Sequence, residues 1–475
     1  MLEKLVWKPR KIDSINPASG ETLRSFDEHG PDDIESALDG AVRAQRAWAE
    51  VPVSERADLL RRTAQVLRDR KGEYGALITA EMGKPIIEAE AEIEKCAWNC
   101  DFYAEKAEEF LAPEPTPSNA SESSVVFDPL GVILAIMPWN YPFWQLFRFL
   151  APAFAAGNGA ILKHASNVPQ CALAIEEVLR EAGAPKGLFK TLLISPPAVE
   201  SLIADPRIAA VTLTGSTEVG SLVASQAGSH IKKQVLELGG SDPFIVLSDA
   251  DVQEAAAVAT RARFLNVGQS CIAAKRFIVE ESVADAFVEA LCSHVRALKV
   301  ADPMERDTNI GPLARANLRE ALHSQVERTV AAGAELKLGG KPVEGPGYFY
   351  EPTVLDRVSP DMAAFTEETF GPAAAVIRAK DADDAIQLAN RTEFGLGAAL
   401  WTRDLDQARK LARRIEAGAV FINGMVASDP RLPFGGIKKS GYGRELGVFG
   451  IREFTNVKTV WIGPAHDKNK VTLSE

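Results

Sequence analysis

The chain has 475 residues, enough for two or three domains, because single hydrophobic cores stop growing near about 250–300 residues. Hydrophobic residues make up 46% and charged residues 25%, which excludes disordered and collagen-like proteins. With 53 basic and 65 acidic residues the formal net charge is −12, so nucleic acid is not an expected main partner.

The N-terminal sequence contains no apolar stretch of the kind found in signal peptides. The apolar run Val132–Met137 is far shorter than the roughly 20 residues of a membrane span. We therefore expect a cytoplasmic protein that does not enter a membrane. Five thinly spread cysteines are expected to be reduced thiols. Cys96 and Cys100 share a helix face, which favours core packing over a metal or redox pair, and we predict no metal site.

Helical and strand-like segments alternate along the chain, which is typical of α/β proteins with parallel sheets. In chain order, the pattern predicts helices over 54–69, 73–82 and 86–103, strands over 131–137, 159–163, 189–194, 209–214 and 243–247, and helices over 251–264 and 284–298. Within the third helix, the stretch 88–95 is interpreted as a charged face exposed to solvent.

Two segments indicate boundaries. Residues 113–124 are rich in proline and serine and lead into a strand-like SVVF. Residues 454–462 are β-branched and aromatic, so a strand here needs a neighbour to cover its apolar surface. We favour an interface between subunits over packing within the same domain.

The predicted strand 209–214 runs directly into Gly215-Ser216-Thr217 and on to Gly220. A strand followed by glycine, a hydroxyl residue and a helix directs free backbone N–H groups at a phosphate. This signal alone is weak, because many capped helices look similar. Lys163 ends the strand 159–163, where α/β sheets bind ligands, although it could equally be a solvated charge.

Cys271 follows a turn-prone segment containing Gly268, as a thiolate nucleophile requires, although a lone cysteine is more often structural. Asn140 follows Pro138, and a proline at helix position N1 would place Asn140 at a helix start. Its amide could then donate to an oxyanion, or it could simply cap the helix. Glu237 lies in an apolar stretch that disfavours its ionised form, which suits a general base, although a structural ion pair is the alternative.

Together these segments resemble the aldehyde dehydrogenase superfamily over nearly the whole chain. The motifs that carry the resemblance occur in this order: Pro138-Trp139-Asn140, Lys163, Gly215-Ser216-Thr217 to Gly220, Glu237-Leu238-Gly239-Gly240, Gln269-Ser270-Cys271, Glu368-Thr369-Phe370-Gly371-Pro372 and Pro433-Phe434-Gly435-Gly436.

The resemblance implies a catalytic role for three residues: Cys271 as nucleophile, Glu237 as general base and Asn140 as oxyanion donor. It implies a thiohemiacetal and then a thioester on the cysteine, which water hydrolyses to the acid. The residues implied to bind the nicotinamide cofactor are Trp139, Lys163, Ser166, Gly215, Ser216, Gly220, Glu368 and Phe370. Among these, Glu368 would bind the nicotinamide ribose, Ser216 the pyrophosphate, and Lys163 with Ser166 the adenosine ribose.

The implied fold is α/β, with a Rossmann-type cofactor domain, an α/β catalytic domain and a small bridging sheet that joins subunits into a homodimer or homotetramer. The predicted division gives residues 1–112 and 131–238 to the cofactor domain, 239–444 to the catalytic domain, and 113–130 with 445–475 to the oligomerisation sheet.

Ser166 stands where many NAD-preferring relatives carry a glutamate. A glutamate would repel a 2′-phosphate, whereas a serine beside Lys163 would not. Two unit charges about 4 Å apart interact by about 4 kcal/mol at a surface-like dielectric. We therefore predict a preference for NADP, with some use of NAD.

Arg148 lies in the apolar run 146–150, where a charge is costly without a partner. Counted along a helix from Asn140, it could reach back and bind a carboxylate at the far end of a substrate. Ser428 could add a hydroxyl contact. The alternative is that Arg148 pairs with an internal acid. Within the superfamily, these features most resemble bacterial succinate-semialdehyde dehydrogenases.

Three alternatives remain. The substrate could be another aldehyde, such as glutarate semialdehyde or an aliphatic one. The chain could be a binding or structural protein that has lost its chemistry, which the three catalytic residues together argue against. A thiol hydrolase is disfavoured because none of the six histidines lies in a recognisable catalytic motif. Acyl transfer to coenzyme A is less expected, because Glu237 can activate water.

Overall fold

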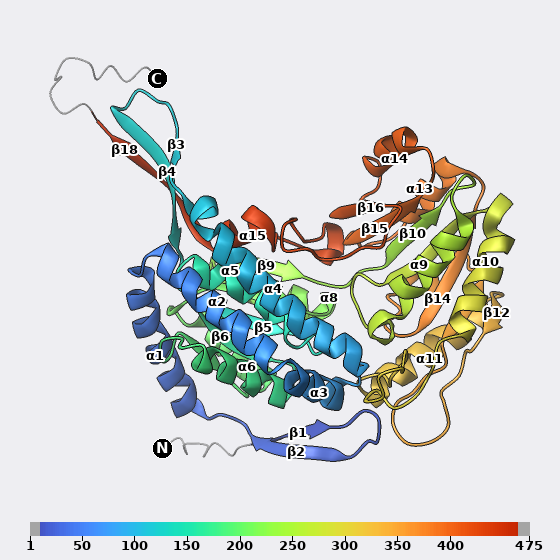
Figure 1. The fold of residues 1–475 in the computed structure, drawn as a ribbon, viewed down its shortest axis with the longest axis horizontal. Coiled ribbons are helices and arrows are strands. Elements are labelled where there is room, and N and C mark those ends of the chain that lie inside the picture. Colours follow the sequence, from blue (N-terminus) through green and yellow to red (C-terminus); the bar gives the residue numbers. More distant parts are fainter. Residues whose placement is uncertain (1–9, 464–475) are drawn as a thin grey trace.

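The computed structural model describes residues 10–463, which form two α/β lobes side by side and a narrow β-sheet that projects from one of them (Figure 1). The predicted α/β class with parallel sheets is confirmed. No helix in residues 10–463 combines the length and apolar character that a bilayer crossing requires.

The first lobe is built on a six-stranded sheet in the order β17-β9-β8-β5-β6-β7. Its strands are β5 (Val132–Met137), β6 (Gly159–His164), β7 (Phe189–Thr191), β8 (Ile208–Thr214), β9 (Lys233–Glu237) and the short antiparallel β17 (Gly441–Tyr442). Its helices are α1 (Pro31–Ala49), α2 (Val53–Asp69), α3 (Lys71–Met82), α4 (Ile86–Leu111), α5 (Trp144–Ala155), α6 (Pro169–Glu181), α7 (Pro196–Ala204) and α8 (Thr217–Ser229).

Burial explains the sequence of the central elements of this lobe. All six residues of β5, VILAIM, are buried, as expected for a parallel strand covered on both faces. Every residue of α5 is buried as well, so this helix lies inside the lobe. The polar groups at its N-terminal end must therefore find partners within the protein.

The second lobe carries a seven-stranded sheet in the order β12-β13-β14-β11-β10-β15-β16. Its strands are β10 (Asp242–Val246), β11 (Ala274–Glu280), β12 (Glu335–Leu338), β13 (Thr353–Asp356), β14 (Ala373–Ala379), β15 (Gly397–Trp401) and β16 (Ala419–Ile422). The helices are α9 (Val252–Phe264), α10 (Glu281–Arg296), α11 (Ala316–Ala331), α12 (Ala363–Thr366), α13 (Ala382–Asn390) and α14 (Leu405–Ala412), with short 3₁₀ turns η1 (Leu265–Gly268) and η2 (Lys438–Ser440).

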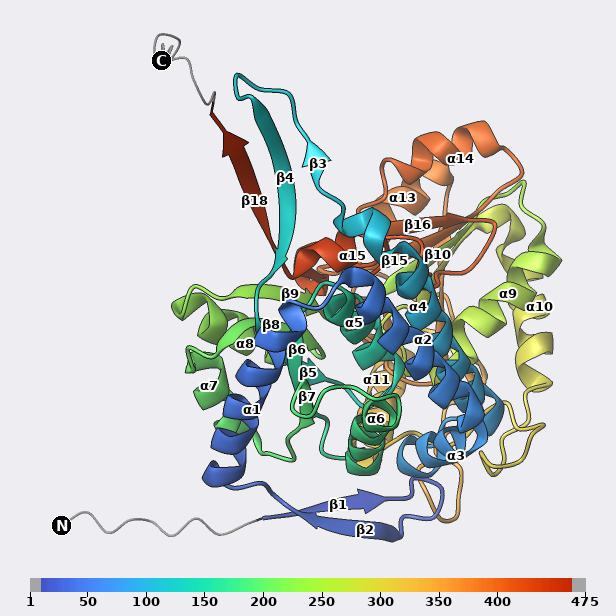
Figure 2. The same ribbon diagram turned by 60° about the vertical axis from the view of Figure 1, so that its left-hand side comes forward.

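The projecting sheet consists of β18 (Thr455–Ile462), β4 (Glu122–Pro129) and β3 (Glu114–Pro115), and both views show it clear of the two lobes (Figure 2). Helix α15 (Gly447–Glu453) leads into β18, and β1 (Lys11–Ile15) with β2 (Thr22–Asp27) forms an N-terminal ribbon. The predicted domain boundaries remain a prediction, and residues 1–9 and 464–475 of that division lie outside the described residues. Strand β17 lies within predicted range 239–444 but pairs with β9 of the first lobe.

The predicted helices and strands are present, with shifts at their ends. Helix α4 continues to Leu111, beyond the predicted end at Tyr103, because residues 104–111 are good helix formers and only Pro113 stops them. Strand β7 ends at Thr191 rather than Ile194. It is an edge strand, paired only with β6.

Candidate active site

The predicted nucleophile Cys271 follows a strained turn, η1, which joins α9 to β11 in the second lobe. Asn266 and Val267 have φ values of 53° and 57°, in the left-handed region that side chains other than glycine rarely adopt. The turn is held from outside, because a Glu88 carboxylate oxygen accepts a hydrogen bond from the Asn266 backbone N–H at 2.7 Å. Strain that the surroundings maintain in this way is typical of functional loops.

Asn140 lies beside this turn, as predicted, but not at a helix start. Its Nδ2 donates to the backbone oxygen of Gln269 at 3.0 Å, two residues before Cys271, and its side chain is buried. Helix α5 begins only at Trp144, so Asn140 sits in the preceding loop. The helical path predicted from Asn140 to Arg148 is therefore wrong for its first half, and Asn140 does not cap the helix.

The cap of α5 comes from another helix. The Glu92 carboxylate of α4 accepts hydrogen bonds from the backbone N–H groups of Phe143 and Trp144, both at 2.9 Å. Lys84 forms a fully buried ion pair with Glu92 and lies 3.6 Å from the centroid of the Tyr141 ring. This pair fixes the loop that carries Asn140, because a negative charge at a helix N-terminus satisfies its free N–H groups.

The Cys271 thiol is partly exposed, and desolvation raises its pKa to about 12, while the charges of Arg148 and Lys275 oppose that rise. The thiol is thus protonated at neutral pH, so a base must take its proton before it can attack. Lys275 also fixes the loop, since its ammonium donates to the backbone oxygens of Ser270 and Cys271 at 2.9 and 2.8 Å.

Glu237 ends strand β9, and its side chain is only 1% exposed. Among residues 10–463 neither of its carboxylate oxygens has a hydrogen-bond partner. Burial raises its pKa to about 8; the charge of Arg148 opposes this and that of Glu445 adds to it. A buried carboxylate without a partner is costly, and here it is poised to exchange a proton near neutral pH.

A cavity of about 250 Å³ opens at the carboxyl ends of β5 and β8. It brings together seven of the predicted site residues: Trp139, Asn140, Gly215, Ser216, Cys271, Glu368 and Phe370. Five others lie outside its lining: Lys163, Ser166, Gly220, Arg148 and Ser428. Glu237 also lies outside it, although Leu238 and Gly239 line it.

The Ser216 end of the cavity has the arrangement of strand, glycine and capped helix that binds phosphate groups. Ser216 is the N-cap of α8, and a Cβ added to Gly215 would meet only Leu213 at 3.6 Å, so a ligand can approach the backbone closely. Glu368 also lines the cavity, accepts a hydrogen bond from the Gly240 N–H at 3.1 Å and lies 3.5 Å from Lys275. 

Gly220, predicted to bind the cofactor, is required for packing. A side chain at this position would collide with Leu238, so the glycine lets α8 lie close to the chain that follows β9. Lys163 and the exposed Ser166 lie at the carboxyl end of β6, beside β5, which is the edge on which the cavity opens. Burial is the one cause that lowers the pKa of Lys163.

Arg148 pairs with an internal acid, the alternative that the sequence left open. Its guanidinium forms a buried ion pair with Glu445, donates to the Thr214 hydroxyl at 3.3 Å and stacks 4.5 Å from the Phe434 ring centroid. Its positive charge nevertheless acts on both Cys271 and Glu237, lowering the pKa of each.

The profile of the aldehyde dehydrogenase family matches residues 7–460. The chain belongs to this family. It is 53% identical over 451 residues to a probable succinate-semialdehyde dehydrogenase (NADP(+)) of Synechocystis sp., covering 95% of this chain and 99% of the relative. It is 51% identical over 448 residues to the succinate semialdehyde dehydrogenase (NAD(P)+) Sad of Escherichia coli, covering 94% and 97%.

Solved structures agree with the family assignment. The crystal structure of succinic semialdehyde dehydrogenase from Streptococcus pyogenes in complex with NADP+ superposes with a TM-score of 0.93 at 37% identity, covering 95% of this aldehyde dehydrogenase and 100% of that chain. The predicted resemblance to the family and its fold is confirmed.

Sequence reasoning missed the residues of α4 that support the site. The stretch 88–95 was interpreted as a solvated face, but Glu92 is buried and Glu88 holds the nucleophile turn. The spacing of Glu88, Glu92 and Lys95 places all three on one side of the helix, which is the signal that the sequence does contain. Nothing local in the sequence reveals that this side faces α5 and the nucleophile turn.

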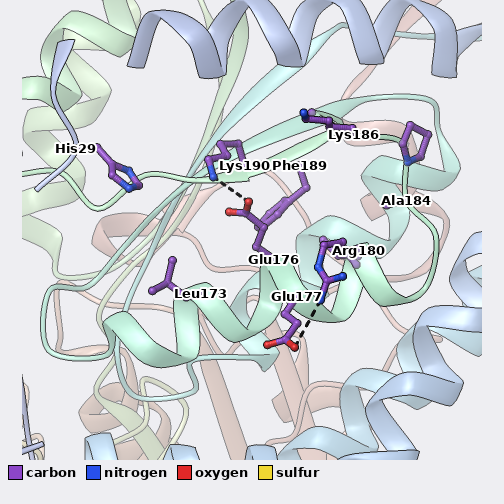
Figure 3. Close-up of a pocket in the computed structure, with 12 residues that line it drawn as sticks. His29, Leu173, Glu176, Glu177, Arg180, Ala184, Lys186, Phe189 and Lys190 are labelled. Carbon is purple, nitrogen blue, oxygen red and sulfur yellow. Dashed lines mark hydrogen bonds and ion pairs between the residues drawn. The ribbon is translucent and has the colours of Figure 1, made fainter. Parts of the chain in front are cut away.

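A larger hollow of about 640 Å³ lies elsewhere, on α6 and β7 (Figure 3). Four of its charged side chains form ion pairs: Lys190 pairs with Glu176 at 2.9 Å and Arg180 with Glu177 at 3.6 Å. None of the predicted site residues lines it. Within residues 10–463, no group of three or more His, Cys, Asp or Glu side chains is arranged to hold a metal ion.

Proposed function

We propose that this aldehyde dehydrogenase oxidises succinate semialdehyde to succinate with NADP⁺, and less efficiently with NAD⁺. The names of its relatives from Synechocystis and Escherichia coli support the substrate and the cofactor.

One observation carries the chemistry. The Asn140 amide is anchored to the Cys271 loop, and the buried Glu237 carboxylate, whose charge raises the pKa of Cys271, lacks a hydrogen-bond partner in the described residues. A fixed amide donor, a thiol and an unsatisfied carboxylate are the three groups that oxidation of an aldehyde through a thioester requires.

In the first stage, the Cys271 sulfur bonds to the aldehyde carbon while its proton passes to a base, for which Glu237 is the candidate. The Asn140 amide and the Cys271 backbone N–H donate to the oxygen as it becomes negative. When bound, the cofactor supplies the oxidised nicotinamide ring that takes up hydride from this adduct, which leaves a thioester on Cys271.

In the second stage, Glu237 first releases the thiol proton to solvent and then accepts a proton from water, whose oxygen attacks the thioester carbon. The carbon–sulfur bond then breaks, succinate leaves and the cysteine is regenerated. A carboxylate whose pKa is about 8 suits both directions of proton transfer near neutral pH.

Lys163 and Ser166 are proposed to face the adenosine ribose and its 2′-phosphate. The exposed serine places no negative charge at the carboxyl end of β6, and the Lys163 ammonium lies on the same strand. Glu368, Phe370 and Ser216 are proposed to hold the nicotinamide ribose and the pyrophosphate.

We further propose that the enzyme is a homodimer or homotetramer joined through β18. All residues of this strand after Thr455 are exposed, including Val457, Trp461 and Ile462, with 62, 50 and 48% of their surface open. An apolar edge strand of this kind needs a partner, and a second copy of the projecting sheet would supply one.

The test is the initial rate of reduced-cofactor formation with succinate semialdehyde and with butanal, each with NADP⁺ and NAD⁺. We expect the highest kcat/KM for the semialdehyde with NADP⁺. Activity on butanal alone would retain the family chemistry but overturn the substrate, and equal efficiency with NAD⁺ would overturn the cofactor preference.

A further inference from the structure

Arg315 contributes a positive charge to the lining of the cavity that contains Cys271. Among the described residues that line this cavity, Arg315 and Glu368 are the two with charged side chains. The Glu368 carboxylate lies 3.5 Å from the buried Lys275 ammonium, whereas Arg315 forms no ion pair within residues 10–463. The cavity therefore presents a cation that no acidic side chain in the described part of the protein neutralises.

An aromatic ring holds the Arg315 guanidinium in place. The guanidinium carbon lies 5.6 Å from the ring centroid of Trp139, and the Trp139 ring meets the Phe370 ring edge-to-face at 5.7 Å. Arg315 directly precedes α11 in the second lobe, and Trp139 follows β5 in the first lobe, so this stack joins the two lobes. A guanidinium that stacks on a ring keeps the N–H groups along its edge available to an anion.

The polar groups of Arg315 are not satisfied by the protein around them. Its Nε is buried and has no hydrogen-bond partner in residues 10–463. Burial lowers the pKa of Arg315, and no neighbouring carboxylate acts in the opposite direction. A partly desolvated cation with a free donor is costly, and an anion bound in the cavity would relieve that cost.

Arg319, one helical turn further along α11, provides the comparison. Its guanidinium also stacks on a ring, 5.9 Å from the centroid of Tyr348, but its Nη1 donates to the backbone oxygen of Gly347 at 2.9 Å. Arg319 does not line the cavity. Stacking is thus common to both arginines, and what distinguishes Arg315 is its free donor and its place in the cavity lining.

We propose that Arg315 binds the pyrophosphate of NADP⁺ from the second lobe, while Ser216 and the N-terminal end of α8 bind it from the first. The inference rests on the proposed function, which places this cofactor in the cavity. Each phosphate carries a negative charge, whereas the donors at Ser216 are neutral. Trp139 and Phe370, which fix Arg315, belong to the proposed cofactor site, and an arginine can bind phosphate oxygens bidentately.

The test is the Kd of NADP⁺ and of NAD⁺ for the full-length Arg315→Met enzyme, measured by isothermal titration calorimetry. We expect both Kd values to rise by about 10-fold or more and by similar factors, because the two cofactors share the pyrophosphate and a charge-assisted contact is lost. If NAD⁺ binds too weakly for calorimetry, its KM replaces its Kd. Arg315→Lys keeps the charge and should recover part of the affinity. Arg319→Met is the matched control and should bind both cofactors as the wild type does.

The other outcomes are distinct. A loss of affinity for NADP⁺ alone would overturn the assignment, because Arg315 would then contact the 2′-phosphate. Unchanged Kd values would also overturn it, and a KM raised for succinate semialdehyde but not for butanal would then point to the substrate carboxylate instead. If Arg315→Met is insoluble, Arg315→Gln removes the charge with a polar side chain and gives the same comparison. A wild-type enzyme that binds neither cofactor would refute the proposed function itself, which separates the two failures.

Discussion

A buried charged side chain in one sheet has all its hydrogen-bond partners, whereas one in the other sheet has none in the described residues. In the seven-stranded sheet, Arg276 of β11 is fully buried and its guanidinium donates to the backbone oxygens of Ser241, Leu388 and Ala389 at 2.8–2.9 Å. In the six-stranded sheet, Glu237 ends β9 almost as deeply buried, yet its carboxylate has no hydrogen-bond partner in the described residues.

This difference separates structural from chemical charges. A buried group whose hydrogen bonds are all made stabilises a particular packing, because removing it leaves its partners unsatisfied. A buried group left without partners costs stability, and we propose that the enzyme keeps Glu237 because its free lone pairs take part in the reaction. The predictions below test each half of this comparison.

The largest effect is expected from Cys271→Ala. Without the sulfur no thioester forms, so formation of reduced cofactor should fall on the order of 10³-fold or more, while the melting temperature stays near the wild-type value. Cys292→Ala is the control, because Cys292 is buried in helix α10. This variant should keep the wild-type turnover. A Cys271→Ala enzyme with near-normal rate would refute the nucleophile.

Arg276→Ala should act on stability instead of chemistry. It removes donors from three buried backbone oxygens and should lower the free energy of unfolding by about 3–5 kcal/mol. Urea denaturation followed by fluorescence measures the change. If folded Arg276→Ala loses kcat while its stability is retained, the structural role assigned to this arginine is wrong.

Asn140→Ala tests the oxyanion donor. Turnover should fall on the order of 10²–10³-fold while cofactor affinity is kept, because the amide is needed only as the carbonyl oxygen becomes negative. Single-turnover rates with succinate semialdehyde provide the measurement. A fall in cofactor affinity that accounts for the whole loss would contradict the role.

Glu237→Gln should reveal the cost of the unpartnered carboxylate. Folding raises the pKa of Glu237 from 4.5 to about 8. The protonated side chain therefore contributes its full stability below pH 4.5, and the wild type loses this part of its unfolding free energy as the pH rises toward 8. The variant cannot ionise. Its melting temperature should therefore match that of the wild type at acid pH and exceed it increasingly up to pH 8. The corresponding gain in the free energy of unfolding is at most about a few kcal/mol. A pH-independent difference would refute the shift.

Ser166→Glu should have the smallest effect. A carboxylate beside the 2′-phosphate would lower kcat/KM for NADP⁺ by about 10-fold and leave that for NAD⁺ nearly unchanged. Ser195→Glu, at the start of α7, is a control on the same lobe. Equal changes in kcat/KM with both cofactors would show that Ser166 does not face the 2′-phosphate.

The sequence predicted the elements well, because apolar β5 and the helices α2 to α4 carry strong local patterns. Seven of the residues that the motifs predicted for the site line the cavity, and the other six do not. The sequence could not predict where α5 begins, since its cap is Glu92, 51 residues from Phe143. The partner of Arg148 was equally hidden, because Glu445 lies far along the chain and reaches it only through the fold.

The central claim is that oxidation proceeds through an acyl group on Cys271 which Glu237 helps to release. The most direct test is rapid acid quench of Glu237→Gln mixed with radiolabelled succinate semialdehyde and NADP⁺, followed by peptide mapping. We predict that label appears on the peptide that contains Cys271, more slowly than in the wild type because the first-stage base is also lost. The amount of label should match the NADPH formed, and hydroxylamine should release the label. NADPH formed without label on Cys271 would contradict the account.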